Sequence, residues 1–333
     1  MRNETVRGLW FVEPHRVTIG EVHLGEPRRE DAVVRTLFSG ISPGTEMLAY
    51  RGEIDEQATL DDTLPALRGS FSYPFRYGYS CVGQVERAGE GLPEGTTVFA
   101  YQPHQERFLV GPGDAVPVDG VAPRHATLLP LVETALQVSL DADAAPGAFA
   151  VVQGLGVVGL LSALVLRRAG AVVLASEPVA ARRTLAGALG IDAVEPADLA
   201  ARVAEQTDGA GAPLVVEISG NPTALAAALP LLSHEGTALV VSWYGTKAVS
   251  LPLGAEFHRR RLTIRSSQVS TIPARLAAEW TTERRRRVAR ELLGELPLEA
   301  LATHVFPFDD AAQAFEEVDR RPDDLVHAAL RYD

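Results

Sequence analysis

Residues 149–178 read FAVVQGLGVVGLLSALVLRRAGAVVLASEP. An apolar run of strand length leads into the spacing Gly154-x-Gly156-x-x-Gly159, a stretch of helix length follows, and a second apolar run ends at Glu177. In such a βαβ unit the first glycine permits a tight turn, the second admits a pyrophosphate, and the third lets helix and strand pack closely. The stretch therefore predicts a Rossmann fold that binds a dinucleotide.

The carboxylate at the end of the second strand indicates which dinucleotide is bound. Glu177 lies eighteen residues after Gly159, where a carboxylate accepts hydrogen bonds from the adenosine ribose and its charge repels a 2′-phosphate. NAD(H) is therefore the favoured cofactor, and NADP(H) is the alternative if Arg182 receives a phosphate. The predicted cofactor-binding residues, which include four on loops after later strands, are Gly154, Gly156, Val157, Val158, Gly159, Glu177, Arg182, Ser219, Ser242, Tyr244 and Lys247.

The remaining pattern predicts a second, mainly β domain of an α/β protein. Strands and helices alternate from Phe149 to Ser267, which indicates a doubly wound parallel sheet. Before this region, short apolar runs are separated by Gly and Pro, as in all-β regions. We expect a Rossmann domain over residues 127–267 and a mainly β domain over residues 1–126, completed by residues 268–333. The basic run Arg284–Arg287 is interpreted as the solvated face of a charged helix.

Composition excludes several other classes of function. The 333-residue chain has a formal net charge of −12, which disfavours binding to nucleic acid or to an anionic membrane surface. A single cysteine, Cys81, excludes an internal disulfide framework and a cysteine-rich zinc lobe. The N-terminal residues contain no apolar run of signal-peptide length, and the longest apolar stretch, around Leu155–Leu166, is too short to span a bilayer. We expect a cytoplasmic protein whose partner is a small-molecule substrate.

A Gly- and Pro-rich β domain followed by this nucleotide domain resembles the medium-chain dehydrogenase/reductase superfamily. The resemblance covers nearly the whole chain and implies a GroES-like catalytic domain, oxidoreductase activity and a homodimer. Several strings look like the subgroup typified by bacteriochlorophyllide a dehydrogenase, which acts on a hydroxyethyl side chain. These strings are SGISPGTEMLAYRGE, FSYPFRYGYS, VFAYQPHQERFLV, EISGNP, SWYGTK and FHRRRLTIRSSQVSTIP.

The resemblance also shows where this sequence departs from the zinc enzymes of the superfamily. Those enzymes hold the metal with a Cys in a GICGTD-like turn, a His in a GHE segment, and a later Cys or Glu. The matching residues here are Ser42, Tyr79 and Glu133. A hydroxyl and a phenol are poor zinc ligands near neutral pH. We therefore predict that no zinc is bound.

Without a metal, side chains must move the proton and stabilise the developing oxyanion. The resemblance places Ser42, Thr45 and Tyr79 in the catalytic site, with Tyr79 as acid/base and the other two as relays. His104 is a rival proton shuttle because an ordinary imidazole titrates near neutral pH, and Glu133 is a candidate general base or a partner that orients Tyr79. A packed aromatic at Tyr79 and a structural histidine at His104 are the open alternatives.

The leading hypothesis is a zinc-independent enzyme that transfers hydride between NAD(H) and a secondary alcohol or ketone on a ring-bearing metabolite. One alternative is an NADPH-dependent enoyl or quinone reductase, which needs no base for an alcohol; Glu177 weighs against it. The other alternative is a dinucleotide-binding protein without catalysis. The polar residues at the vacated ligand positions argue against that loss of chemistry.

Overall fold

The computed structural model describes residues 4–333, which form two compact units. Residues 4–130 and Leu293–Asp333 make up the first unit, and Leu131–Leu292 make up the second. The boundaries follow Pro130 and Leu292, whereas the boundaries expected from the sequence follow Ala126 and Ser267. Residues 268–292 belong to the second unit because helix α8 (Thr282–Leu293) is joined by a buried ion pair to α3 (Leu129–Ala142).

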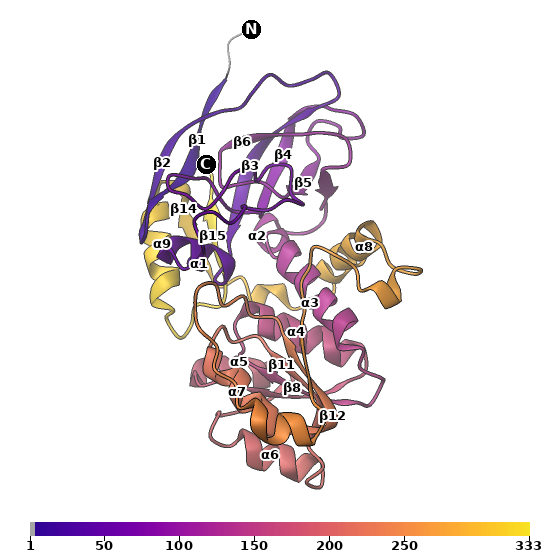
Figure 1. Ribbon diagram of the computed structural model, residues 1–333. Helices are drawn as coiled ribbons and strands as arrows, with labels where there is room; N and C mark the ends of the chain where they lie inside the picture. Colours follow the sequence, from indigo (N-terminus) through magenta and orange to yellow (C-terminus); the bar gives the residue numbers. More distant parts are fainter. Residues whose placement is uncertain (1–3) are drawn as a thin grey trace. The chain divides into compact units, whose positions relative to one another are not determined.

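The second unit contains the predicted parallel sheet, with strand order β10-β9-β8-β11-β12-β13. Numbered within this unit, the order is 3-2-1-4-5-6, which is the Rossmann order and reverses between β8 and β11. Figure 1 shows β8, β11 and β12 side by side. The strands are β8 (Phe149–Gln153), β9 (Val172–Ser176), β10 (Asp192–Val194), β11 (Ala212–Glu217), β12 (Leu232–Val240) and β13 (Thr263–Ser266).

Helices connect these strands and cover the sheet. They are α4 (Val157–Arg168), α5 (Ala180–Ala188), α6 (Leu199–Gln206) and α7 (Pro222–Ala228), whereas α3 precedes β8 and α8 follows β13. Side chains of β8, β9, β11 and β12 share a buried cluster with apolar residues of α6 and α7. Within residues 4–333, none of the helices is long and apolar enough to cross a membrane.

The first unit contains a seven-stranded sheet and the β1-β2 hairpin. The sheet order is β14-β15-β3-β4-β5-β7, and β6 pairs with β3. Strands β14 and β15 come from the end of the chain, so this segment completes the first unit. The strands are β1 (Thr5–Glu13), β2 (Arg16–His23), β3 (Ala32–Ile41), β4 (Cys81–Arg87), β5 (Thr97–Ala100), β6 (Arg107–Val110), β7 (Ala115–Pro117), β14 (His304–Pro307) and β15 (Ala328–Arg331).

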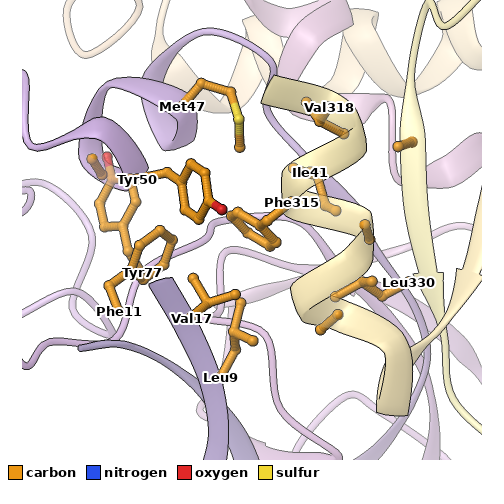
Figure 2. Close-up of a cluster of buried hydrophobic side chains, with 14 of the residues drawn as sticks. Leu9, Phe11, Val17, Ile41, Met47, Tyr50, Tyr77, Phe315, Val318 and Leu330 are labelled. Carbon is orange, nitrogen blue, oxygen red and sulfur yellow. The ribbon is translucent and has the colours of Figure 1, made fainter. Parts of the chain in front are cut away.

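The main core of the first unit joins its two chain segments. Helices α1 (Thr45–Arg51) and α9 (Ala311–Arg320) contribute to it, and α2 (Pro123–Ala126) is a short connecting turn. Figure 2 shows Phe315 of α9 beside Tyr50 of α1, with Phe11 and Tyr77 in the same cluster. This packing fixes the start of α1, which carries Thr45, and the segment that leads to Tyr79.

Candidate active site

The glycine turn of the second unit has the shape that a dinucleotide requires. Gly154 has φ +101°, and a Cβ there would lie 2.7 Å from the Cα of Ser219. A Cβ at Gly159 would lie 2.0 Å from the carbonyl oxygen of Gly154. By contrast, nothing lies within 4 Å of the Cβ position at Gly156, which directly precedes α4. Space at Gly156 and the unshared N–H groups of Val157 and the rest of the first helical turn suit a phosphate.

Glu177 lies directly against this turn. Its carboxylate accepts hydrogen bonds from the backbone N–H groups of Leu155 at 2.7 Å and Val179 at 3.0 Å. The side chain is buried. A carboxylate has about four lone-pair positions, so these two bonds leave acceptor capacity. On the next helix, the guanidinium of Arg183, the neighbour of Arg182, is bonded to the backbone of Glu177 and to Glu195.

Two of the four predicted residues on later loops, Ser219 and Tyr244, are bonded to Glu217, which was not among the predicted site residues. Glu217 is fully buried at the end of β11 and accepts hydrogen bonds from both the N–H and the hydroxyl of Ser219. The hydroxyl of Tyr244 donates to its other oxygen. Ser242 accepts from the N–H of Gly220 at 2.8 Å, and the N–H of Lys247 donates to the carbonyl of Tyr244. Glu217 therefore ties together the loops after β11 and β12.

In the first unit, the structure brings Ser42, Thr45 and Tyr79 together; we call these three the hydroxyl cluster. Ser42 follows β3, Thr45 begins α1, and Tyr79 precedes β4. The hydroxyls of Ser42 and Thr45 interact with the Tyr79 phenol. Ser42 is buried, whereas Thr45 and Tyr79 are partly exposed. The neighbouring Ser80 anchors this segment by donating to the carbonyl of Thr127 at 2.6 Å.

The phenol of Tyr79 stays protonated at neutral pH. Burial raises its pKa to about 12, and the carboxylate of Glu46 acts in the same direction. The hydroxyls of Ser42 and Thr45 oppose this shift because hydrogen bonds to a phenolate stabilise it. The hydroxyl cluster can therefore donate a proton and stabilise the phenolate that remains.

His104 is buried inside the first unit, which argues against its predicted role as a proton shuttle. Its side chain is inaccessible, and both ring nitrogens are engaged. Nε2 lies 2.8 Å from Glu46 and Nδ1 lies 2.7 Å from Ser39. Glu46 was contained in the quoted SGISPGTE string, yet its role depends on a histidine 58 positions later in the chain.

The structure also corrects the roles expected for Glu133 and for the Arg284–Arg287 run. Arg285 is buried and its Nε and Nη2 atoms both lie 3.0 Å from Glu133 Oε1. Its Nη1 donates to Gln137 at 2.5 Å. Because Glu133 is buried against this guanidinium, it serves as a structural anion in the second unit instead of a general base. The run likewise is not a uniformly solvated face.

The donor set at the positions of the zinc ligands does not fit zinc. Ser42 and Tyr79 offer neutral hydroxyl oxygens, and the pKa of the Tyr79 phenol lies far above neutral pH. Glu133 is bonded to Arg285. Zinc prefers thiolate, imidazole and carboxylate ligands. In addition, across residues 4–333 no three His, Cys, Asp or Glu side chains converge as a possible metal site.

A second buried histidine, His327, lies beside Gly40 in β3, the strand that leads to Ser42. A Cβ at Gly40 would be 3.0 Å from its Nε2, and its Nδ1 has no hydrogen-bond partner among residues 4–333. Burial lowers its pKa from 6.5 to about 4. The folded protein therefore holds this ring neutral at pH values where an unfolded chain would protonate it.

This difference predicts an acid-sensitive stability. The unfolded chain binds the extra proton below pH 6.5, so the stability present above that pH is lost progressively as the pH falls toward 4. From pH 7 to pH 5 we expect His327 to account for a loss of about 2 kcal/mol. Urea unfolding of the full chain at both pH values, compared with His327→Leu, measures this loss. His23→Asn, which changes an exposed histidine, is the control and should keep the wild-type loss. If His327→Leu lost as much free energy of unfolding between pH 7 and pH 5 as the wild-type protein, the expectation would be contradicted.

Comparison with known proteins agrees with this fold. The family model described as "Zinc-binding dehydrogenase" matches residues 157–284, a segment that contains neither Ser42 nor Tyr79. D-guloside 3-dehydrogenase of Escherichia coli is 27% identical over 322 residues, covering 90% of this chain and 92% of that protein. The 2-desacetyl-2-hydroxyethyl bacteriochlorophyllide A dehydrogenase of Cereibacter sphaeroides is 28% identical, covering 94% of each.

Among solved structures, 2R,3R-butanediol dehydrogenase from Bacillus subtilis superposes with a TM-score of 0.80 at 19% identity. The alignment covers 98% of this chain and 100% of that one. It therefore shows the same fold over the whole length, with a Rossmann sheet and a GroES-like β domain. Together with the two related sequences, both of which are named as dehydrogenases, it shows that this chain is similar in sequence and in fold to dehydrogenases.

Proposed function

We propose that this protein transfers hydride between NAD(H) and a secondary alcohol or its ketone on a ring-bearing metabolite, without zinc. The observation that carries the proposal is the hydroxyl cluster of Ser42, Thr45 and Tyr79 at positions where zinc enzymes of the superfamily have their site. Side chains that share hydrogen-bonding hydroxyls supply a proton and stabilise the resulting anion, which is the chemistry that carbonyl reduction needs.

The second unit has the residues that would hold the dinucleotide. Open space at Gly156 and the N-terminus of α4 suit the pyrophosphate, and the acceptor capacity of Glu177 suits the adenosine ribose. When bound, the nicotinamide ring supplies or accepts the hydride. The buried Glu217 orders the Ser219 and Tyr244 loops at the carboxyl end of the sheet, where ligands of such sheets bind.

Tyr79 supplies the proton in the direction of ketone reduction. Its phenol is protonated at neutral pH, so it donates a hydrogen bond to a carbonyl oxygen and then the proton itself. The O–H bond of Tyr79 breaks as the alcohol O–H bond forms, and the hydroxyls of Ser42 and Thr45 stabilise the phenolate. Oxidation of the alcohol runs through the same groups in reverse.

The substrate class rests on the relatives. One is named for a D-guloside and the other for a hydroxyethyl bacteriochlorophyllide, and both of these compounds contain rings. A panel of cyclic ketones and their secondary alcohols, followed by NADH absorbance, tests this class. Turnover of ketones supports the proposal, whereas turnover confined to conjugated alkenes or quinones would assign the protein to the reductases of that kind.

The cofactor assignment makes its own prediction. We expect NADH to bind at least roughly tenfold more tightly than NADPH, corresponding to about 1.4 kcal/mol, because the Glu177 carboxylate repels a 2′-phosphate. Nicotinamide fluorescence during titration of the full chain measures both affinities. Arg182→Ala should leave the ratio unchanged. Tighter binding of NADPH, lost in Arg182→Ala, would reverse the assignment and show that Arg182 binds the phosphate.

A further inference from the structure

A hydrogen-bonded glutamate and histidine lie at the centre of the first unit. Glu46 and His104 are both 0% exposed, and Nε2 of His104 lies 2.8 Å from Oε2 of Glu46. Burying a carboxylate without donors is costly. The two side chains therefore form a buried, hydrogen-bonded pair, unlike the ion pairs on the surface of this unit.

This pair contacts both chain segments that supply the hydroxyl cluster. Glu46 Oε1 accepts a hydrogen bond from the backbone N–H of Ser42 at 3.0 Å. On the other side, the His104 ring lies against Gly78, the residue before Tyr79. A Cβ at Gly78 would be 2.7 Å from Cδ2 of that ring, and Gly78 has φ +115°. Ser42 and Tyr79 are thus both positioned against one pair.

The ring of His104 is itself held in one orientation. Its Nδ1 lies 2.7 Å from the hydroxyl of Ser39, which lies 2.9 Å from the hydroxyl of Tyr332. A carboxylate accepts but does not donate, so Nε2 carries the hydrogen that Glu46 accepts, and in the neutral ring Nδ1 accepts from Ser39. Ser39 and Tyr332 are buried as well. The chain of contacts leaves the pair little freedom to rotate.

We propose that Glu46 and His104 are the positioning residues of the hydroxyl cluster: they hold the Ser42 and Tyr79 segments together and place a carboxylate beside the phenol. The consequence for turnover rests on the proposed function, whereas the consequence for Tyr79 itself does not.

The charges around Tyr79 define what the carboxylate contributes. After burial, the negative charge of Glu46 is the largest cause that raises the pKa of Tyr79. The carboxylate of Asp61 raises it less, and the hydroxyls of Ser42 and Thr45 lower it. The ring of Tyr77 also contacts Tyr79, edge to face. Removing the Glu46 charge should therefore make the phenol more acidic.

The test uses the full chain with 3-fluorotyrosine at position 79, followed by ¹⁹F NMR during a pH titration. Glu46→Gln keeps the shape and can still accept from the Ser42 N–H. We expect its titration midpoint to lie lower than that of the labelled wild-type protein by about one pH unit. The matched control is Glu106→Gln, since Glu106 bonds to Arg7 in the same unit. An unchanged midpoint in Glu46→Gln, or an equal shift in the control, would overturn the role of the charge.

His104→Gln separates the positioning effect of the pair from the effect of the Glu46 charge. The same variant tests the proposal if Glu46→Gln does not fold. Glutamine can still donate to Glu46, but it removes the ring that packs against Gly78. We expect the titration of the labelled Tyr79 to stay the same while kcat for an active ketone falls about tenfold to a hundredfold, with NADH binding retained. Unchanged kcat would exclude a positioning role. If no ketone or alcohol is turned over, the proposed function fails, and the ¹⁹F titration still decides the placement of the charge.

Discussion

Tyr79→Phe is expected to lower kcat for an active ketone by about 10²–10⁴-fold, the range for loss of a positioned general acid. The variant removes one hydroxyl and keeps the aromatic ring, so the packing against Tyr77 is preserved. Because the dinucleotide site is built by the glycine turn and Glu177, the affinity for NADH should not change. Steady-state kinetics and an NADH titration measure the two quantities separately.

Tyr77→Phe is the matched control. Tyr77 is buried two residues earlier in the chain, and burial raises the pKa of its phenol as well. Loss of this hydroxyl should leave kcat within a few-fold of wild type, because Ser42 and Thr45 interact with Tyr79. Unchanged kcat in Tyr79→Phe, or equal losses in both variants, would remove Tyr79 as the proton donor.

Arg285→Met is expected to lower the free energy of unfolding by about 3–5 kcal/mol, because it leaves the Glu133 carboxylate buried without its guanidinium. Gln137 would lose its donor at the same time. This loss of unfolding free energy reports how strongly the Arg285–Glu133 ion pair holds α8 against α3 in the second unit. Urea unfolding of the full chain gives the value.

Two further variants show whether the pair acts through charge. Arg287→Met changes an exposed arginine of the same helix and should cost less than about 1 kcal/mol. Replacing both partners, in Glu133→Leu with Arg285→Met, should be less harmful than Arg285→Met alone, because no unpaired charge is buried. A single loss below about 1 kcal/mol, or strict additivity in the double variant, would mean that the ion pair has no special role.

The Rossmann unit could be predicted because its determinants are local. Gly154, Gly159 and Glu177 lie within one βαβ segment, and each is required by the geometry of that segment. Gly154 has a positive φ, Gly159 allows a close backbone approach, and Glu177 ends a strand beside the turn. The charged helix that contains the Arg284–Arg287 run was also predicted, and it corresponds to α8. Its burial was not, since the partner of Arg285 lies 152 positions earlier.

The hydroxyl cluster was accessible from the sequence only through the resemblance, because Ser42 and Tyr79 are far apart in the chain. Neither composition nor periodicity could assign Glu46 or His104, whose roles depend on each other's positions. The contact between Ser39 and Tyr332 joins positions 293 residues apart. Such pairs are set by the order of strands in the sheet, where β15 lies beside β3.

Glu217 illustrates the same limit in the second unit. The residue occurs in the quoted EISGNP string. The sequence pattern of a carboxylate at a strand end is the same whether the carboxylate binds a ligand or hydrogen-bonds to the loops of its own chain. In the structure its oxygens are bonded by Ser219 and Tyr244. The three buried glutamates of the second unit discussed above therefore differ in role: Glu177 lines the glycine turn, whereas Glu217 and Glu133 hold elements together.

We propose that a nicotinamide dinucleotide and a cluster of hydroxyl groups suffice for hydride transfer without a metal ion. The most direct measurement is turnover of an active ketone by protein dialysed against a strong chelator, with the zinc content determined on the same sample. We expect full activity at a zinc content far below one ion per chain. Loss of activity on chelation, restored by added zinc, would contradict it.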